Sequence, residues 1–218
     1  MASVVDLLCN ERALIARGDV VVGLDEVGRG SLAGPLVVGA VTLSVVKDPP
    51  EGLDDSKALS SRQREALVPD LERWCDEWSL GWVSAEEIDE WGLAMALSVA
   101  ATRALDGLTR SPSFALVDGP HNFLRAPREV SFGVDAPPAG YADLAHTTIV
   151  KGDSVSAVIA AASVVAKVRR DQYMRELHAQ CPLYEWESNK GYGSAAHLTA
   201  LRALGPSIHH RRSWKLPN

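Results

Sequence analysis

Residues 20 to 43 read VVVGLDEVGRGSLAGPLVVGAVTL, and this stretch decides the fold. A run of β-branched residues leads to adjacent acids at Asp25 and Glu26, two glycines interrupt the run, and a second apolar run covers residues 36 to 43. This pattern predicts a strand, a glycine turn and a returning strand. Because the first strand is otherwise apolar, the carboxylate of Asp25 is poorly solvated unless a positive charge lies beside it.

Gly28, Gly30 and Ala33 have the spacing of a dinucleotide-binding fingerprint, which requires a helix to begin at the second glycine. Pro35 and the strand-forming residues 36 to 43 follow instead, so the context argues against a dinucleotide site. A glycine-arginine-glycine turn beside two acids is better suited to close approach of the backbone to a ligand. Its arginine, Arg29, is then available for a phosphate.

Two further apolar segments are predicted to be strands that end in an acid. Residues 114 to 118 end in Asp118, and residues 149 to 153 end in Asp153. An alanine-rich helix is predicted over 154 to 180, and its N-terminal dipole favours an anion at Asp153. Asp135 is a rival acid, but a single acid after a strand is more typical of a solvated turn.

Four acids are therefore candidates for one metal site: Asp25, Glu26, Asp118 and Asp153. If they meet at neighbouring strand ends, four like charges share a small volume and need cations to neutralise them. Ligands that are all oxygen select hard divalent ions, which here means Mg²⁺ or Mn²⁺. A pair of such ions can activate water and stabilise the leaving oxygen when a phosphodiester is hydrolysed.

The motif Asp25-Glu26-Val27-Gly28-Arg29-Gly30 resembles the signature of the type 2 ribonucleases H, and it is best matched by the bacterial ribonuclease HII family. Other segments resemble family motifs in the family's order: Asp55-Ser56-Lys57, Val117-Asp118-Gly119, Lys151-Gly152-Asp153, residues 160 to 171, and Asn189-Lys190-Gly191-Tyr192-Gly193. Together these segments cover most of residues 20 to 214.

The resemblance implies an α/β, ribonuclease H-like fold with a mixed five-stranded sheet flanked by helices. The strands are expected near residues 20, 36, 78, 114 and 147. A single domain over residues 1 to 218 would comprise an N-terminal helix within 1 to 19, an insertion or extended loop at 120 to 148, and a small C-terminal helical part at 181 to 218 that grips the substrate.

The resemblance also implies an endoribonuclease that acts on RNA:DNA hybrids and on single ribonucleotides within a DNA duplex. It would leave a 3′-hydroxyl and a 5′-phosphate, and it would serve in the removal of ribonucleotides and RNA primers. Asp25, Glu26, Asp118 and Asp153 would hold two Mg²⁺ or Mn²⁺ ions and carry out the catalysis.

The family's substrate contacts fall on two loops. Gly28, Arg29 and Gly30 would touch the ribose 2′-hydroxyl, which distinguishes RNA from DNA. Tyr192 would pack on the sugar beside the scissile junction. Lys57 is a candidate phosphate contact, although a salt bridge to a neighbouring aspartate is an equally good interpretation.

Two alternatives to a hybrid-cleaving ribonuclease remain open. An integrase-type nuclease could use the same metal site on another phosphodiester. A non-catalytic module that binds RNA:DNA hybrids could keep the fold without the activity, but such a module would be expected to lack at least one of the four acids, and all are present.

Composition is consistent with a globular protein that handles nucleic acid in the cytoplasm. With 218 residues, 46% apolar and 23% charged, one domain with a sizeable core is expected. No apolar run reaches membrane-spanning length, so we expect a cytoplasmic protein without membrane contact, and a monomer. Three widely spaced cysteines match no metal-ligand pattern and are interpreted as reduced thiols.

The net charge of −6 argues against a generic nucleic-acid binder, which usually has a basic surface. The charge is unevenly distributed, however. Residues 1 to 150 hold 12 Lys+Arg and 23 Asp+Glu, whereas residues 151 to 218 hold 10 and 5. A phosphate backbone is therefore expected to lie along the C-terminal third.

Overall fold

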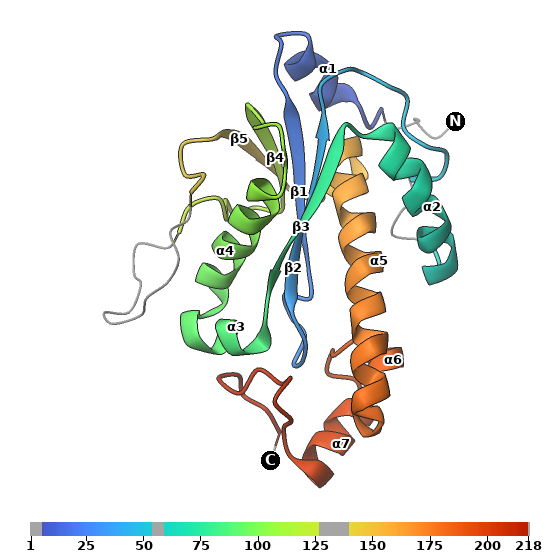
Figure 1. Ribbon diagram of the computed structural model, residues 1–218, viewed down its shortest axis with the longest axis vertical. Helices are drawn as coiled ribbons and strands as arrows, with labels where there is room; N and C mark the ends of the chain where they lie inside the picture. Colours follow the sequence, from blue (N-terminus) through green and yellow to red (C-terminus); the bar gives the residue numbers. More distant parts are fainter. Residues whose placement is uncertain (1–5, 54–58, 127–139, 218) are drawn as a thin grey trace.

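A computed structural model describes residues 6–53, 59–126 and 140–217. Within them a mixed five-stranded sheet has the order β3-β2-β1-β4-β5 (Figure 1), as expected from the sequence. The strands are β1 (Val21–Val27), β2 (Leu36–Leu43), β3 (Glu77–Val83), β4 (Phe114–Asp118) and β5 (Ala145–Ile149). The helices are α1 (Cys9–Ile15), α2 (Ser61–Trp74), α3 (Ala85–Trp91), α4 (Leu93–Asp106), α5 (Ala157–Gln180), α6 (Trp186–Asn189) and α7 (Ala195–Leu204), with short 3₁₀ turns η2 (Gly152–Ser154) and η3 (Pro182–Tyr184).

The register of the sheet brings the acid-bearing strand ends together. β1, β2 and β3 form an antiparallel meander, whereas β4 is parallel to β1 and β5 is parallel to β4. Leu24 of β1 pairs with Val117 of β4, so Asp25 and Asp118 come next on adjacent parallel strands. Parallel strands end at the same edge of a sheet, which puts both acids at one edge.

Helices cover both faces of the sheet (Figure 1). α2 and α5 lie on one face with α1 near the end of the sheet, and α3 and α4 lie on the other. α5 packs unusually close to β1 and β2, because a Cβ at Gly23 would collide with the Val158 backbone and one at Gly39 would lie 2.6 Å from the Ala162 carbonyl oxygen. The glycines thus set the distance between α5 and the acid-bearing strand.

The C-terminal part lies at the far end of α5 and contacts the loop that follows β1. Met174, Tyr184, Trp186 and Leu201 belong to a separate apolar cluster there, which also includes Ala33 of the loop. An isolated β-bridge joins Ala33 to His210. The C-terminal segment is therefore packed against the glycine turn.

The long helix begins later than the sequence pattern indicated. α5 starts at Ala157 and not at residue 154, because Ser156 adopts an extended conformation and its Oγ accepts a hydrogen bond from the Ile159 N–H. Asp153 instead lies in η2, a single 3₁₀ turn. The expectation that the dipole of α5 directly stabilises Asp153 is therefore wrong.

Some sequence expectations fall on segments outside the described residues. They include Lys57, Asp135 and residues 127 to 139 of the insertion expected at 120 to 148; the last residues of that insertion belong to β5. The strand-like pattern at 129 to 134 lies outside them as well. Of the helices in the described ranges, none combines the length and apolarity needed to cross a membrane.

Candidate active site

The structure brings the four predicted acids to one edge of the sheet. Asp25 and Asp153 are buried, with 8% and 5% of their surface exposed, while Glu26 and Asp118 are partly buried. The Gly152 N–H donates to Asp118 Oδ1 at 2.6 Å, which ties the end of β4 to the turn that carries Asp153. Acids far apart in the sequence thus share a small volume.

The pKa of Asp25 reports how unfavourable this arrangement is without a cation. Burial raises its pKa to about 8, and the negative charges of Asp118, Glu26 and Asp153 add to the effect. A hydrogen bond with Ser163 of α5 opposes it. A carboxyl group with such a pKa holds a proton at neutral pH unless a positive charge replaces it.

Glu26 is subject to the same forces to a smaller degree. Burial raises its pKa, while Arg29, whose Nη1 lies 3.3 Å from Glu26 Oε1, lowers it. Arg29 therefore neutralises Glu26 in part and lies beside the acids. Its position agrees with the expectation that the glycine-arginine-glycine turn borders the acid cluster.

The donor set fits a hard divalent cation, although the described side chains do not form a closed cage. Among residues 6–53, 59–126 and 140–217, no three Asp, Glu, His or Cys side chains are close enough together to hold a metal ion by themselves. Mg²⁺ typically takes one or two carboxylates and completes its shell with waters and substrate phosphate. Oxygen donors whose repulsion a cation would relieve satisfy that requirement.

A cleft of about 230 Å³ opens beside these acids. Glu26 and Asp153 line one part of it, and Arg64 and Lys167 contribute cations. Lys167 Nζ also lies 2.6 Å from Asp171 Oδ1. A cleft with carboxylates and cations suits a phosphate group that contacts a metal ion and basic side chains together.

The two glycines of the turn differ in the space around them. Gly28 has φ = 81°, and a Cβ there would collide with the Arg170 guanidinium, so the turn itself requires glycine. Gly30 is exposed, and a Cβ there would meet no atom within 4 Å. The space next to Gly30 is therefore accessible to a ligand.

Arg170 joins the two loops that were expected to contact substrate. Its fully buried guanidinium donates to the carbonyl oxygens of Pro35 at 2.8 Å and Lys190 at 2.9 Å, and to Ser31 Oγ at 2.8 Å. The central carbon of this guanidinium, Cζ, lies 5.6 Å from the ring centroid of Tyr192, and Tyr192 is 38% exposed. Arg170 therefore fixes the loop after β1 and supports the tyrosine.

Arg211 holds the same turn from the C-terminal segment. Its guanidinium is fully buried and donates to the carbonyl oxygens of Gly28, Arg29 and Gly34 at 2.6, 2.8 and 3.1 Å. Burial, followed by the positive charge of Arg170, lowers the pKa of Arg211 to about 9. The Arg211 side chain is therefore engaged within the protein, although it lies in the basic C-terminal third.

Two histidines connect this segment to the tyrosine loop. His197 Nδ1 lies 2.9 Å from the Tyr192 carbonyl oxygen, and its Nε2 lies within 3.2 Å of both Trp186 Nε1 and His210 Nε2. The indole can only donate, so His197 Nε2 accepts and its Nδ1 carries the proton. His210 then donates from Nε2 and accepts at Nδ1 from Ser207. Every contact is satisfied when both rings are neutral.

Sequence reasoning missed Ser163, Arg170 and Arg211. The spacing Ala162, Ala166, Arg170 and Met174 follows one stripe at four-residue intervals, and all four are largely buried. That stripe is the signal that would have placed Arg170 inside. We find no comparable pattern around Arg211.

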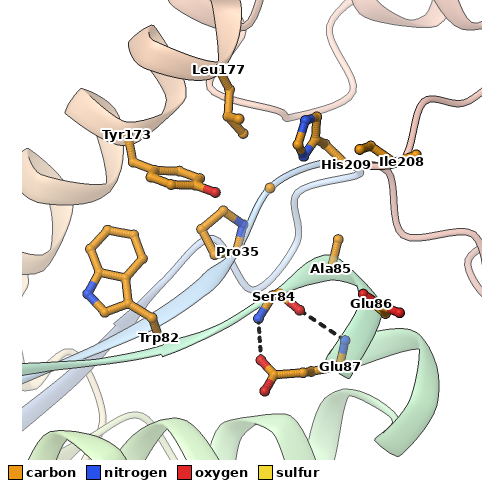
Figure 2. A pocket seen from close by; sticks show the side chains of 11 residues that line it. Pro35, Trp82, Ser84, Ala85, Glu86, Glu87, Tyr173, Leu177, Ile208 and His209 are labelled. Carbon is orange, nitrogen blue, oxygen red and sulfur yellow. Dashed lines mark hydrogen bonds between the residues drawn. The ribbon is translucent and has the colours of Figure 1, made fainter. Parts of the chain in front are cut away.

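A larger cavity lies apart from the acids. It has a volume of about 650 Å³ and is lined by Pro35, Trp82, Tyr173 and Leu177 among others, with none of the four acids. Figure 2 shows Trp82 and Tyr173 on one side, Ile208 and His209 on the other, and the reciprocal Ser84–Glu87 bonds at its rim. Size alone therefore does not locate the candidate site.

Known proteins resemble this chain over most of its length. The family model described as "Ribonuclease HII" matches residues 22–217, which include the four acids and the two loops. The chain belongs to the ribonuclease HII family. It is thus an enzyme of the ribonuclease H type, and the expected fold and family are confirmed.

Relatives in this family cover nearly the whole chain. A Jannaschia protein named "Ribonuclease HII" is 47% identical over 90% of each chain. A Streptomyces griseus protein with the same name is 43% identical over 89% of this chain and 76% of its own. Among solved structures, a ribonuclease H2 from Pyrococcus horikoshii superimposes with a TM-score of 0.66 at 26% identity, covering 90% of this chain and 94% of its own.

Proposed function

We propose that this ribonuclease HII cleaves the RNA strand of RNA:DNA hybrids and cuts at single ribonucleotides in duplex DNA. The observation that carries the proposal is the position of the acid cluster beside the Gly28–Gly30 turn, which Arg170 connects to Tyr192. A metal-binding edge next to a loop suited to the ribose 2′-hydroxyl supports cleavage directed by ribonucleotides.

Asp25, Glu26, Asp118 and Asp153 would hold Mg²⁺ or Mn²⁺. When bound, these ions would lower the pKa of a water and stabilise the charge that develops on the phosphate oxygens. Ser163 orients Asp25, and the Gly152 N–H orients Asp118, so both carboxylates are held before substrate arrives. Lys167 and Arg64, which line the same cleft, would bind the phosphate.

The two loops would select the ribonucleotide. The backbone of Gly28, Arg29 and Gly30 would contact the 2′-hydroxyl, and Tyr192 would pack on the sugar beside the junction. Lys57, which lies outside the described residues, remains a proposed phosphate contact. The partners would be RNA:DNA hybrids and ribonucleotide-containing duplexes, and we expect the protein to act as a monomer.

The activity is tested with three duplexes: all DNA, DNA with one ribonucleotide, and DNA opposite a run of RNA. Each is incubated with Mg²⁺, Mn²⁺ or chelator, and the products are sized and their ends identified. Cuts that need both a ribonucleotide and a divalent ion, and that leave 3′-hydroxyl and 5′-phosphate ends, support the proposal. Equal cutting of the all-DNA duplex would indicate a nuclease of another specificity.

The role of the turn is tested with Gly30→Val. A Cβ at this position meets no protein atom within 4 Å, so the variant should fold, while the branched group occupies the space intended for the 2′-hydroxyl. We expect cleavage at a single ribonucleotide to fall at least about tenfold, which corresponds to roughly 1.4 kcal/mol. Gly140→Val adds the same group at another exposed glycine and should have no effect. Unchanged cleavage by folded Gly30→Val would remove the turn from substrate recognition.

A further inference from the structure

Helix α1 makes an unexpected set of contacts with the residues that follow Asp153. Glu11 is fully buried, and its Oε1 accepts hydrogen bonds from Ser156 Oγ at 2.6 Å and the Val158 N–H at 3.2 Å. The Leu7 carbonyl oxygen accepts from the Ala157 N–H at 2.8 Å. Helix α1 and the residue Leu7 just before it thus bind three consecutive residues at the start of α5.

The turn that carries Asp153 depends on its flanks for its shape. η2 is a single 3₁₀ turn preceded by Lys151 in the left-handed region, at φ = 57°. Such short turns have poor hydrogen-bond geometry and little stability of their own. On one side the Gly152 N–H is bonded to Asp118. On the other side the Ser156 N–H is bonded to the Gly152 carbonyl oxygen, so the position of Ser156 is transmitted to the turn.

Glu11 stabilises the start of α5, but burying its carboxylate costs free energy. Its Oε2 is buried and has no hydrogen-bond partner among the described residues. Burial also raises its pKa, which shows that the carboxylate is disfavoured there. The first turn of α5 has no acid of its own, so Glu11 supplies from a distant segment the anion that the helix N-terminus favours. Its contacts end three residues from Asp153, which suggests a task beyond capping.

We propose that Glu11 is a positioning residue for the metal site, acting through Ser156 and Val158 to hold the turn that presents Asp153. The proposal rests on the proposed function, since it requires that Asp153 bind the metal ion. Three leucines in and next to α1 pack in the main core, so α1 holds Glu11 in a fixed position: Leu7, Leu8 and Leu14. Loss of the Glu11 contact allows η2 to sample other conformations, and the metal site then forms less often.

The test measures Mn²⁺ binding to the protein alone, by calorimetry or electron paramagnetic resonance, without substrate or turnover. Glu11→Ala is expected to raise the Mn²⁺ dissociation constant about 3- to 10-fold, at or below the effect of losing a group that touches a metal ligand directly. Glu11→Gln keeps an oxygen acceptor at the same place and should recover most of the affinity.

The matched control is Ser84→Ala. Ser84 caps α3, because its Oγ accepts a hydrogen bond from the Glu87 N–H. Loss of this cap should lower the free energy of unfolding by about 1 kcal/mol at a place remote from the acids. A merely structural role for Glu11 would make Glu11→Ala behave like Ser84→Ala, with reduced stability and unchanged Mn²⁺ affinity. That result would overturn the proposal.

Two further outcomes are distinguishable. If Glu11→Ala does not fold, Ser156→Ala decides the question, because it removes the 2.6 Å bond between Ser156 Oγ and Glu11 Oε1; unchanged Mn²⁺ affinity in that variant overturns the proposal, and weakened affinity supports it. If the unmodified protein binds no Mn²⁺, the proposed metal site itself is wrong. Normal binding by the unmodified protein and by both Glu11 variants refutes only the role of Glu11.

Discussion

The acid cluster and the arginine pair are buried charge clusters of opposite sign at the same end of the sheet, and they are stabilised in different ways. Burial, together with repulsion from the other acids, raises the pKa of Asp25 to about 8. Arg170 and Arg211 also repel each other, yet backbone carbonyl oxygens surround each guanidinium. The arginine pair is thus complete within the protein, whereas we propose that a cation from outside completes the acid cluster.

This difference distinguishes residues that are suited to bind a ligand from residues that hold the structure together. Buried charges without a countercharge are costly unless hydrogen bonds satisfy them. Arg170 and Arg211 are satisfied, and the loops they hold adopt one conformation before substrate arrives. The acids keep their binding capacity for a ligand. Changes in the acids should therefore have effects that depend on metal, and changes in the arginines should not.

The largest expected effect is the loss of cleavage in Asp118→Asn. An amide oxygen is a neutral and weaker ligand, so turnover with Mg²⁺ should fall at least about a hundredfold, while binding of an RNA:DNA hybrid persists. Turnover and hybrid affinity are measured side by side, with the exposed Asp143→Asn as control. Retention of more than about a tenth of the turnover would remove Asp118 from the metal site.

The arginine pair is tested through stability. Arg211→Met leaves the carbonyl oxygens of Arg29 and Gly34 without a donor and removes one donor from the Gly28 carbonyl oxygen, so the free energy of unfolding should fall by about 2–4 kcal/mol. Denaturant unfolding should give the same loss in chelator and in saturating Mg²⁺. Arg212→Met changes the exposed neighbour and should have little effect. A loss that Mg²⁺ abolishes would contradict the distinction between the two clusters.

The strands and the acids could be predicted because they follow from local patterns. Apolar runs that end in an acid, such as Phe114 to Asp118, identify both the strand and the edge of the sheet. The arginine pair could not be predicted in the same way. The residues that satisfy Arg211 are backbone carbonyls some 180 positions earlier, as in the bond to Gly28, and backbone carbonyls leave no mark in a sequence.

The start of α5 illustrates a second limit of sequence reasoning. The alanine-rich pattern correctly predicts a long helix, but the place where it begins is set by Ser156 and by Glu11 of another helix. Contacts between distant segments thus moved Asp153 out of the helix and into a separate turn. By contrast, a helix cap formed within one short segment, such as Ser84 with Glu87, follows from a local sequence pattern.

The buried histidine pair, His197 and His210, predicts that the stability of the protein depends on pH. Burial, helped by the charges of His197, His209 and Arg212, lowers the pKa of His210 to about 4, below its usual value of 6.5. The unfolded chain therefore binds the proton more readily, so this contribution to stability is complete above pH 6.5 and is lost as the pH falls through 4.

Chemical denaturation between pH 7 and 4 measures this contribution. We expect the free energy of unfolding to fall by about 1–3 kcal/mol more in the unmodified protein than in His210→Gln, which cannot take up the proton. His121→Gln, at an exposed histidine, should keep the full pH dependence. The same dependence in His210→Gln and the unmodified protein would show that the neutral ring is not what ties the C-terminal segment to the turn.

The melting temperature of Asp153→Asn, measured with and without Mg²⁺, tests most directly whether the acid cluster is one cation site. The expected effect is the smallest of those predicted here. In chelator the substitution relieves repulsion among carboxylates, so the variant should melt about 1–3 °C above the unmodified protein, since 1 kcal/mol corresponds to roughly 2–4 °C in a chain of this size. Saturating Mg²⁺ should shrink or reverse this gap, because the unmodified protein binds the ion more tightly. An equal gap in both conditions would contradict the account and exclude Asp153 from the metal site.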